Sequence, residues 1–191
     1  YGATAGGQPR LSQITDAVDS NRWAKVFYSY NGATECGSAV SGFDATPPSG
    51  LLFAVKTNDG RANYFYYKSG QLSRIVQPGN QMTDLYYEAV QNASGATIGY
   101  RLSGMRDSLA MDVIAAGVRP DDDNSKTQIT YDVLGRATSV KQPAATVGAS
   151  RIEHTLQYLP GKKAYTDQNG NAVPGYYGAV QQHVTGASEP N

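Results

Sequence analysis

The sequence predicts a mainly β fold, an antiparallel β-hairpin ribbon forming a curved or spiral sheet with one short helix. Of its 191 residues, 21 are glycine and 14 are tyrosine, a usage that favours strands and tight turns over helices. Short apolar and aromatic runs recur every 8–12 residues or so, which is typical of antiparallel all-β architecture. Dipeptides suited to tight turns separate them: Asn31-Gly32, Asp59-Gly60, Ser69-Gly70, Pro78-Gly79 and Asn169-Gly170.

The expected strands are residues 24–30, 51–57, 62–67, 84–90, 96–104, 127–132 and 154–159. One segment, 109–116, is rich in alanine and leucine and predicts the helix. Asp107 or Ser108 can cap its start, Gly117 stops it and Pro120 follows. Residues 1–177 are expected to form one structural unit, and 178–191 a weakly ordered tail or a link to a further segment. Because Tyr1 begins in mid-phrase, we expect a piece of a longer protein.

Charge and cysteine usage exclude several classes of function. Sixteen basic and sixteen acidic residues cancel, so the chain has no basic excess with which to bind nucleic acid. No apolar stretch is long enough to predict membrane insertion. The single cysteine, Cys36, excludes an internal disulfide framework and a zinc site built on thiolates.

One phrase is written three times, at residues 10–17, 71–78 and 136–143. The shared pattern is Arg/Gln, Leu/Ala, Ser/Thr, any residue, Ile/Val, any residue, Asp/Gln, then Pro/Ala. Two copies follow a glycine and, earlier, a tyrosine: Tyr67 with Gly70, and Tyr131 with Gly135. A weaker echo begins at Tyr158 and Gly161.

Each part of the phrase fits a hairpin. The tyrosine ends one strand, and the glycine supplies the backbone conformation of a tight turn. Leu72 and Ile75 lie on opposite faces of the returning strand, and Pro78 closes it because proline cannot donate to the ladder. The array therefore predicts a repeating β-ribbon.

Residues 131–143, "YDVLGRATSVKQP", resemble the YD repeat of the Rhs family, Tyr-Asp-x-x-Gly-Arg-Leu-x-x-Val-x-x-Pro. The matching residues are Tyr131, Asp132, Gly135, Arg136 and Val140, with Pro143 at the end. The copy at Tyr67 departs from the motif. It has Lys68 in place of the aspartate, Gln71 in place of the arginine, and one residue fewer before the glycine.

The resemblance implies a non-enzymatic segment of a β-ribbon shell, secreted or displayed at a bacterial surface, as in Rhs toxins and the related teneurins. The partners that the resemblance implies are adjacent repeats of the same or identical chains, and an enclosed toxin domain. No counterpart of the family's C-terminal core motif or self-cleaving aspartate is visible, so no protease activity is carried over. No cofactor is implied.

Other chemistry has only weak support. Cys36 with His154 or His183 could form a nucleophile and base, but no catalytic context surrounds the cysteine. Asp167, Asn169 and Asn171 alternate as in a calcium loop, although a hairpin turn explains them better. The run 121–123 of three aspartates is a second weak cation candidate, favoured as a solvated loop. We therefore expect no catalytic and no metal site.

The tyrosine clusters suggest an alternative function, a carbohydrate-binding surface. The candidate glycan contacts are Tyr66, Tyr86 and Tyr176, although cross-strand packing also explains such clusters. A further alternative is a self-assembling extracellular filament, because copies that satisfy one another's strand edges propagate. Asn92 begins an Asn-Ala-Ser triplet that can accept a glycan on a eukaryotic secretory route.

Overall fold

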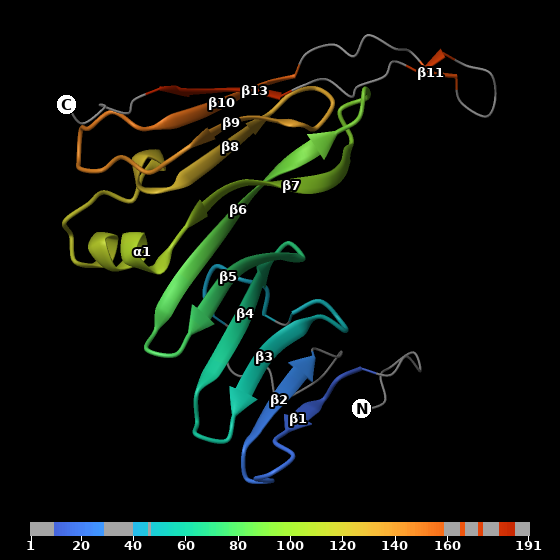
Figure 1. The fold of residues 1–191 in the computed structure, drawn as a ribbon, viewed down its shortest axis with the longest axis vertical. Helices are drawn as coiled ribbons and strands as arrows, with labels where there is room; N and C mark the ends of the chain where they lie inside the picture. Colours follow the sequence, from blue (N-terminus) through green and yellow to red (C-terminus); the bar gives the residue numbers. More distant parts are fainter. Residues whose placement is uncertain are drawn as a thin grey trace.

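The computed structural model describes residues 10–28, 40–45 and 47–158, together with the backbone of strands at 165–166, 172–173 and 180–185. The mainly β prediction is confirmed. Eleven strands form one open antiparallel sheet, and two short strands form a separate pair. Figure 1 shows the sheet running the length of the molecule from β1 to β13.

The strands of the large sheet follow one another in sequence order from β1 to β10, and β13 then pairs with β10. Their bounds are β1 Gln13–Thr15, β2 Trp23–Tyr28, β3 Leu52–Thr57, β4 Ala62–Lys68, β5 Gln71–Gln77, β6 Gln81–Gln91, β7 Thr97–Arg106, β8 Thr127–Tyr131, β9 Ala137–Lys141, β10 Glu153–Tyr158 and β13 Val180–Thr185. The separate pair is β11 Tyr165–Thr166 and β12 Ala172–Val173. Each phrase at Tyr67 and Tyr131 is the predicted hairpin, β4–β5 and β8–β9. Strand β13 lies in the segment expected to be a tail or link.

The predicted helix is present one residue earlier, as α1 Ser108–Ala115. Asp107 is its N-cap, and the carboxylate accepts a hydrogen bond of 2.8 Å from the Ala110 N–H. Gly117 ends the helix with φ +70°, the left-handed conformation common just after a helix. A one-turn 3-10 helix, Asp123–Ser125, follows before β8. None of the described helices is long and apolar enough to cross a membrane.

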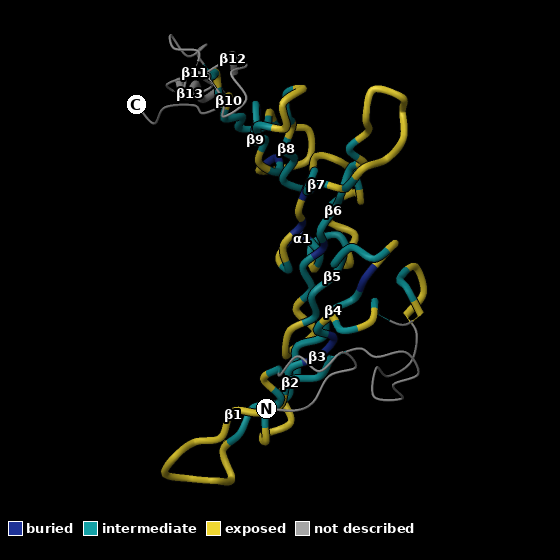
Figure 2. The backbone as a smooth tube through the Cα atoms, turned by 90° about the vertical axis from the view of Figure 1, so that its right-hand side faces the viewer, coloured by how far each residue is buried: buried dark blue, intermediate teal, exposed yellow. Residues whose placement is uncertain are grey.

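The sheet is a single layer with little core of its own. Among the described residues, the buried apolar side chains are Phe53, Ala54, Tyr67, Ala110 and Ala144. Figure 2 shows that residues of intermediate and full exposure make up most of the ribbon. A domain stabilised by its own core covers one face of each sheet with a second layer. Most of this sheet has no such layer within the described residues.

The β6–β7 hairpin is longer than its neighbours and extends beyond them (Figure 1). Pairing of β5 with β6 stops at Arg74 opposite Asp84. On the other side, β7 pairs with β8 only at Gly104–Gln128 and Met105–Thr127. In the outer half of the hairpin, β6 and β7 therefore pair only with each other among the described strands, and neither pairs with β5 or β8.

Charged side chains join the strands where the hairpin meets the rest of the sheet. Arg74 holds Asp84 through two hydrogen bonds of 2.5 and 2.7 Å. Arg106, only 4% exposed, donates to the Tyr86 hydroxyl and the Ser125 hydroxyl, both at 2.9 Å. Buried charges are tolerated when hydrogen-bonded in this way. Packing across the centre of the ribbon is therefore polar, which the apolar pattern alone does not predict.

Candidate functional sites: the repeat turns and the pocket beside β6

The turn after Tyr131 is closed by backbone hydrogen bonds. The Asp132 N–H donates to the Arg136 carbonyl at 2.9 Å, and the Gly135 N–H donates to the Asp132 carbonyl at 3.0 Å. Gly135 has φ +79°, a conformation that costs an L residue about 1–2 kcal/mol. The glycine of the repeat is therefore required by the backbone path of the turn.

The carboxylate of Asp132 organises the same turn. It accepts hydrogen bonds from the Leu134 and Arg136 N–H groups, each at 2.9 Å, and from the Arg136 guanidinium at 2.7 Å. Desolvation alone would raise the pKa of Asp132, but these hydrogen bonds and the Arg136 charge hold it below its usual value. Aspartate and arginine of the repeat thus act as one turn-closing pair.

The tyrosine of the repeat ties the hairpin to the preceding strand. The Tyr131 hydroxyl donates to the Leu102 carbonyl of β7 at 2.6 Å. The Arg101 guanidinium lies over the Tyr131 ring at 4.4 Å from its centroid, and Arg136 lies over Tyr158 at the same distance. Cation–π contacts of this kind link successive strands. Tyr131 and Tyr158 are therefore occupied by packing.

The degenerate copy of the repeat at Tyr67 also has an anchored tyrosine and a capped glycine turn, but a different carboxylate caps the turn. The Tyr67 hydroxyl donates to the Leu52 carbonyl of β3 at 2.7 Å, and its turn has Ser69 and Gly70 at φ +50° and +77°. Lys68 replaces the motif's aspartate. The carboxylate of Asp44, from the β2–β3 connection, instead accepts the Ser69 and Gly70 N–H groups, both at 2.9 Å. Burial, and secondarily Tyr87, raises the pKa of Tyr67.

The β6–β7 turn has the same hydrogen bonds as the Asp132 turn, although the sequence pattern did not predict it. The Asn92 N–H donates to the Ala96 carbonyl, and the Gly95 N–H to the Asn92 carbonyl, both at 2.9 Å. Asn92 Oδ1 accepts the Ser94 and Ala96 N–H groups at 3.1 and 2.9 Å. These are the bonds of the Asp132 turn. The signal was present as an Asn or Asp three residues before a glycine, but the strand residue before Asn92 is Gln91 and not tyrosine.

All three turns are preceded by the same irregularity in pairing. The register shifts between Tyr66 and Tyr67, between Val90 and Gln91, and between Thr130 and Tyr131. A bulge of this kind bends a strand and increases its twist. All three turns therefore combine a shift in register with a glycine turn, and the two that follow Tyr67 and Tyr131 add an anchored tyrosine.

The first copy of the phrase, at residues 10–17, forms only an edge strand and lacks the preceding tyrosine and turn glycine of the other copies. Its central residues form β1, which pairs with β2 through Ile14 opposite Ala24. The Arg10 guanidinium lies 5.1 Å from the ring centroid of Tyr28. The fourth echo is described only at Tyr158, because Gly161 lies outside the described residues.

The three aspartates at 121–123 have structural partners. Asp121 pairs with Arg106 at 2.8 Å, and Asp123 with Lys126 at 2.6 Å. Asp122 caps the 3-10 helix by accepting the Asn124 N–H. Within the described part of the chain, no three His, Cys, Asp or Glu side chains are grouped so as to hold a metal ion.

Several other sequence candidates cannot be placed by side chain. Cys36, Asp167, Asn169, Asn171 and Tyr176 lie outside the described residues. His183 belongs to β13, whose backbone alone is described, with Thr155 as its pairing partner. The ring of His154 lies 3.2 Å from the Gln142 amide.

The two described glycan candidates have ring contacts within the protein. The Tyr66 ring packs against Phe43 and Tyr64, with centroids 5.6 and 6.5 Å apart. The Tyr86 ring lies under Arg106 and Lys126, at 5.5 and 4.5 Å. Burial raises the pKa of Tyr86 against the opposing effect of Arg106. Glycan contact at these positions stays a prediction.

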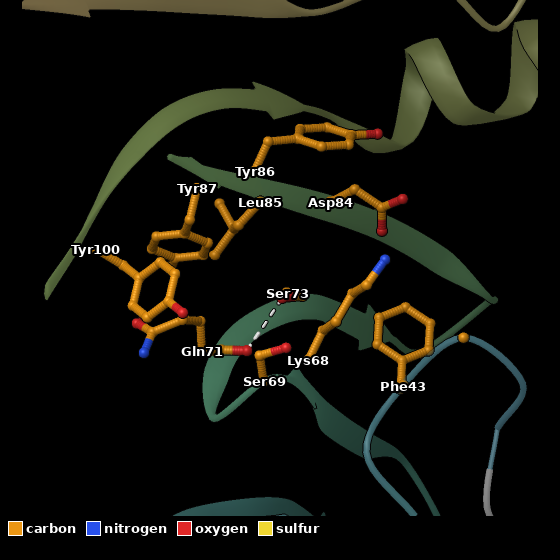
Figure 3. A pocket seen from close by; sticks show the side chains of 11 residues that line it. Phe43, Lys68, Ser69, Gln71, Ser73, Asp84, Leu85, Tyr86, Tyr87 and Tyr100 are labelled. Atoms are coloured by element: carbon orange, nitrogen blue, oxygen red, sulfur yellow. Dashed lines mark hydrogen bonds between the residues drawn. The ribbon is translucent and has the colours of Figure 1, made fainter. Parts of the chain in front are cut away.

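A pocket of about 350 Å³ lies where β5 and β6 separate. Leu85, Tyr87 and Tyr100 gather at one end, and Lys68 and Phe43 lie toward the other (Figure 3). The pocket combines aromatic, amide, hydroxyl and charged groups. Such a mixture suits binding to an amphipathic ligand.

No protein-family model matches the chain, and no curated protein matches it significantly. The resemblance of residues 131–143 to the YD repeat therefore stays a prediction, carried by the motif and by the geometry of the turns.

Proposed function

We propose that the chain is a non-enzymatic scaffolding segment of a β-ribbon shell of the Rhs/YD-repeat kind, secreted or displayed at a cell surface. It makes its contacts through strand edges to adjacent repeats or to identical chains. The same edges, satisfied by identical copies, would build a filament. If the ribbon forms part of a shell, a toxin domain enclosed by that shell is a further partner.

The observation that carries the proposal is the shared turn. Three hairpins combine a register shift and a glycine at positive φ with side-chain oxygens that accept the turn's N–H groups. Two of them also anchor a tyrosine hydroxyl to the preceding strand. Each repeat contacts mainly its neighbours, as in other repeat proteins, so the ribbon can lengthen without a new core.

The single-layer sheet supports the same role. Among the described strands, the order in the sheet follows the sequence from β1 to β10, and β1 and β13 each have one neighbouring strand. Unpaired edges bind further strands readily. Charges distributed over both signs, with no net charge, also remove the repulsion that would keep copies apart.

Sedimentation velocity over a wide concentration range tests the proposal. We expect reversible association or aggregation of the wild-type chain. Ile14→Lys places a charge on the exposed face of edge strand β1, where Ile14 is 57% exposed, and should weaken association. Val133→Lys, at an exposed turn tip between β8 and β9, is the matched control for the β1 edge and should leave association through β1 unchanged.

A folded wild-type chain that stays monodisperse and monomeric at every concentration would overturn the proposal. Circular dichroism of each variant separates lost association from lost folding. If Ile14→Lys and Val133→Lys weaken association equally, the added charge acts through solubility in general, and the β1 edge is not the contact.

A further inference from the structure

Strand β6 has an edge in the middle of the sheet that no strand of the described residues covers. Its first residues pair with β5 as far as Asp84, opposite Arg74, and its remaining residues, 85–91, pair with β7 alone. Figure 1 shows β6 continuing past the ends of β4 and β5. Terminal strand β1 has three residues, whereas this internal edge is long enough to pair with several residues of another strand.

The pocket between β5 and β6 follows this edge. Four consecutive residues of β6 line it: Asp84, Leu85, Tyr86 and Tyr87. Successive side chains of a strand point to opposite faces of the sheet. The cavity therefore follows β6 from Asp84 to Tyr87, beginning where the pairing of β6 with β5 ends.

The edge lacks the usual protection against strand addition. Exposed edges are commonly blocked by lysine or proline, and residues 85–91 contain neither. The one charged residue, Glu88, is held by the Arg101 guanidinium at 2.5 Å. Its charge is thus neutralised by the partner strand.

The two ends of the pocket differ in chemistry. Leu85, Tyr87 and Tyr100 form an apolar end, and within the described residues neither tyrosine ring stacks on another ring or cation. At the other end Lys68 points toward β6 (Figure 3). It makes no ion pair with any described residue.

We propose that this slot binds an extended peptide segment, which adds as a strand to residues 85–90 of β6. One apolar side chain of the peptide packs against Leu85, Tyr87 and Tyr100, and an acidic side chain reaches Lys68. Main-chain hydrogen bonds supply the affinity, and the alternate side chains supply the selectivity. The inference goes beyond the scaffolding role, because it requires no assembly of copies.

Isothermal titration calorimetry with a defined probe tests the slot. The probe is acetyl-Ser-Val-Asp-Val-Ser-Val-amide, which alternates apolar and polar residues and carries one acid. Two matched peptides bear N-methyl groups either on the three valines or on the serines and aspartate. Because successive N–H groups point to opposite edges of a strand, each methylated peptide loses its donors on one edge.

We expect the probe to bind with a dissociation constant below about 1 mM. One methylated peptide should lose binding at least about tenfold and the other much less, because one peptide edge faces β6. Hydrogen exchange should slow at amides within residues 85–90. Lys68→Gln should weaken binding by about twofold to fivefold, and Lys25→Gln, on β2, should leave it unchanged.

Absence of binding to the folded chain would overturn the proposal, as would equal affinity of the two methylated peptides. Binding without protection of residues 85–90 would place the peptide elsewhere and overturn it too. Displacement of the probe by maltose, with no difference between the methylated peptides, would assign the pocket to a glycan instead. Sedimentation of the same samples distinguishes failure of the slot from failure of the scaffolding proposal.

Discussion

The hairpins after Tyr131 and Tyr67 reach the same arrangement with carboxylates from different parts of the chain. In the first, Asp132 lies within the turn that it closes. In the second, the turn is one residue shorter, and Asp44 reaches it from the β2–β3 connection. The comparison teaches that a repeat can lose its signature aspartate when a neighbouring loop supplies the same acceptor.

The two turns therefore differ in the parts of the chain that their hydrogen bonds join. The Asp132 turn is stabilised by bonds within five residues, so it can form early and locally. The Asp44 bonds span 25 and 26 residues, and ordering the intervening chain costs entropy. The Tyr67 turn thereby fixes a long connection against the end of β4, in addition to joining two strands.

Truncation of the two tyrosines gives the largest expected effect. Tyr67 is 6% exposed, so Tyr67→Ala should lower the free energy of unfolding by about 3–5 kcal/mol. Tyr131→Ala should lower it less, because Tyr131 is only half-buried. Urea denaturation measures both. Equal losses would contradict the tighter packing of the Tyr67 hairpin.

Alanine at the two turn glycines should affect the hairpins equally. Gly70 and Gly135 have φ +77° and +79°, and an added Cβ has no close neighbour at either position. Each substitution should therefore lower the free energy of unfolding by about 1–2 kcal/mol through backbone strain alone. Thermal unfolding of Gly70→Ala and Gly135→Ala checks this, with Gly79→Ala as a third turn of φ +80°. A difference between the first two larger than the strain itself would count against the shared turn geometry.

Removal of the two carboxylates separates local from remote capping. Asp44→Ala and Asp132→Ala should each lower the free energy of unfolding, because each removes a carboxylate that accepts two N–H groups of its turn. Only Asp44→Ala should also speed hydrogen exchange at the amide of residue 44, whose N–H donates to the Tyr67 carbonyl at 2.7 Å, because the connection loses its attachment to the turn. Amide exchange read by NMR shows whether the two effects differ as expected.

The smallest expected effect is a pH dependence of the Tyr131 hairpin. The pKa of Asp132 lies below its ordinary value of 3.8 in the folded chain, so its contribution is present above the unfolded pKa. It is lost as pH falls through the lower, folded pKa. The stability difference between wild type and Asp132→Asn should therefore shrink below pH 3.8. A difference that stays constant down to strongly acidic pH would show that ionisation of Asp132 is not what stabilises the turn.

Much of the strand pattern could be predicted because its signals are local. Alternating side chains and turn glycines act over a few residues, and the expected strands at 62–67 and 127–132 correspond to β4 and β8. The turn at Asn92 escaped prediction because Gln91 stands before it, where the other two turns have a tyrosine. Its Asx side chain and glycine alone fold it the same way.

The pocket beside β6 could not be predicted, because it depends on where two strands separate. Residues 71–73 and 85–87 look as competent to pair as their neighbours. The pairing of β5 with β6 ends at Arg74–Asp84, close to register shifts at Tyr66–Tyr67 in the β4–β5 pair and at Tyr86–Tyr87 in the β6–β7 pair. Strand curvature sums over several residues of both partners, and a single-strand pattern does not contain it.

Most of the strands, a helix capped by Asp107 or Ser108, and the glycine turn after Asp132 follow from the sequence, since each depends on contacts within a few residues. The choice of Asp107 as the cap, the capping of the Tyr67 turn by Asp44 and the pairing of Arg74 with Asp84 appear only in the folded chain. So does the edge of β6 that no described strand covers. These features join residues brought together by the curvature of the whole ribbon, and the free energy of such contacts depends on a geometry that no short segment specifies.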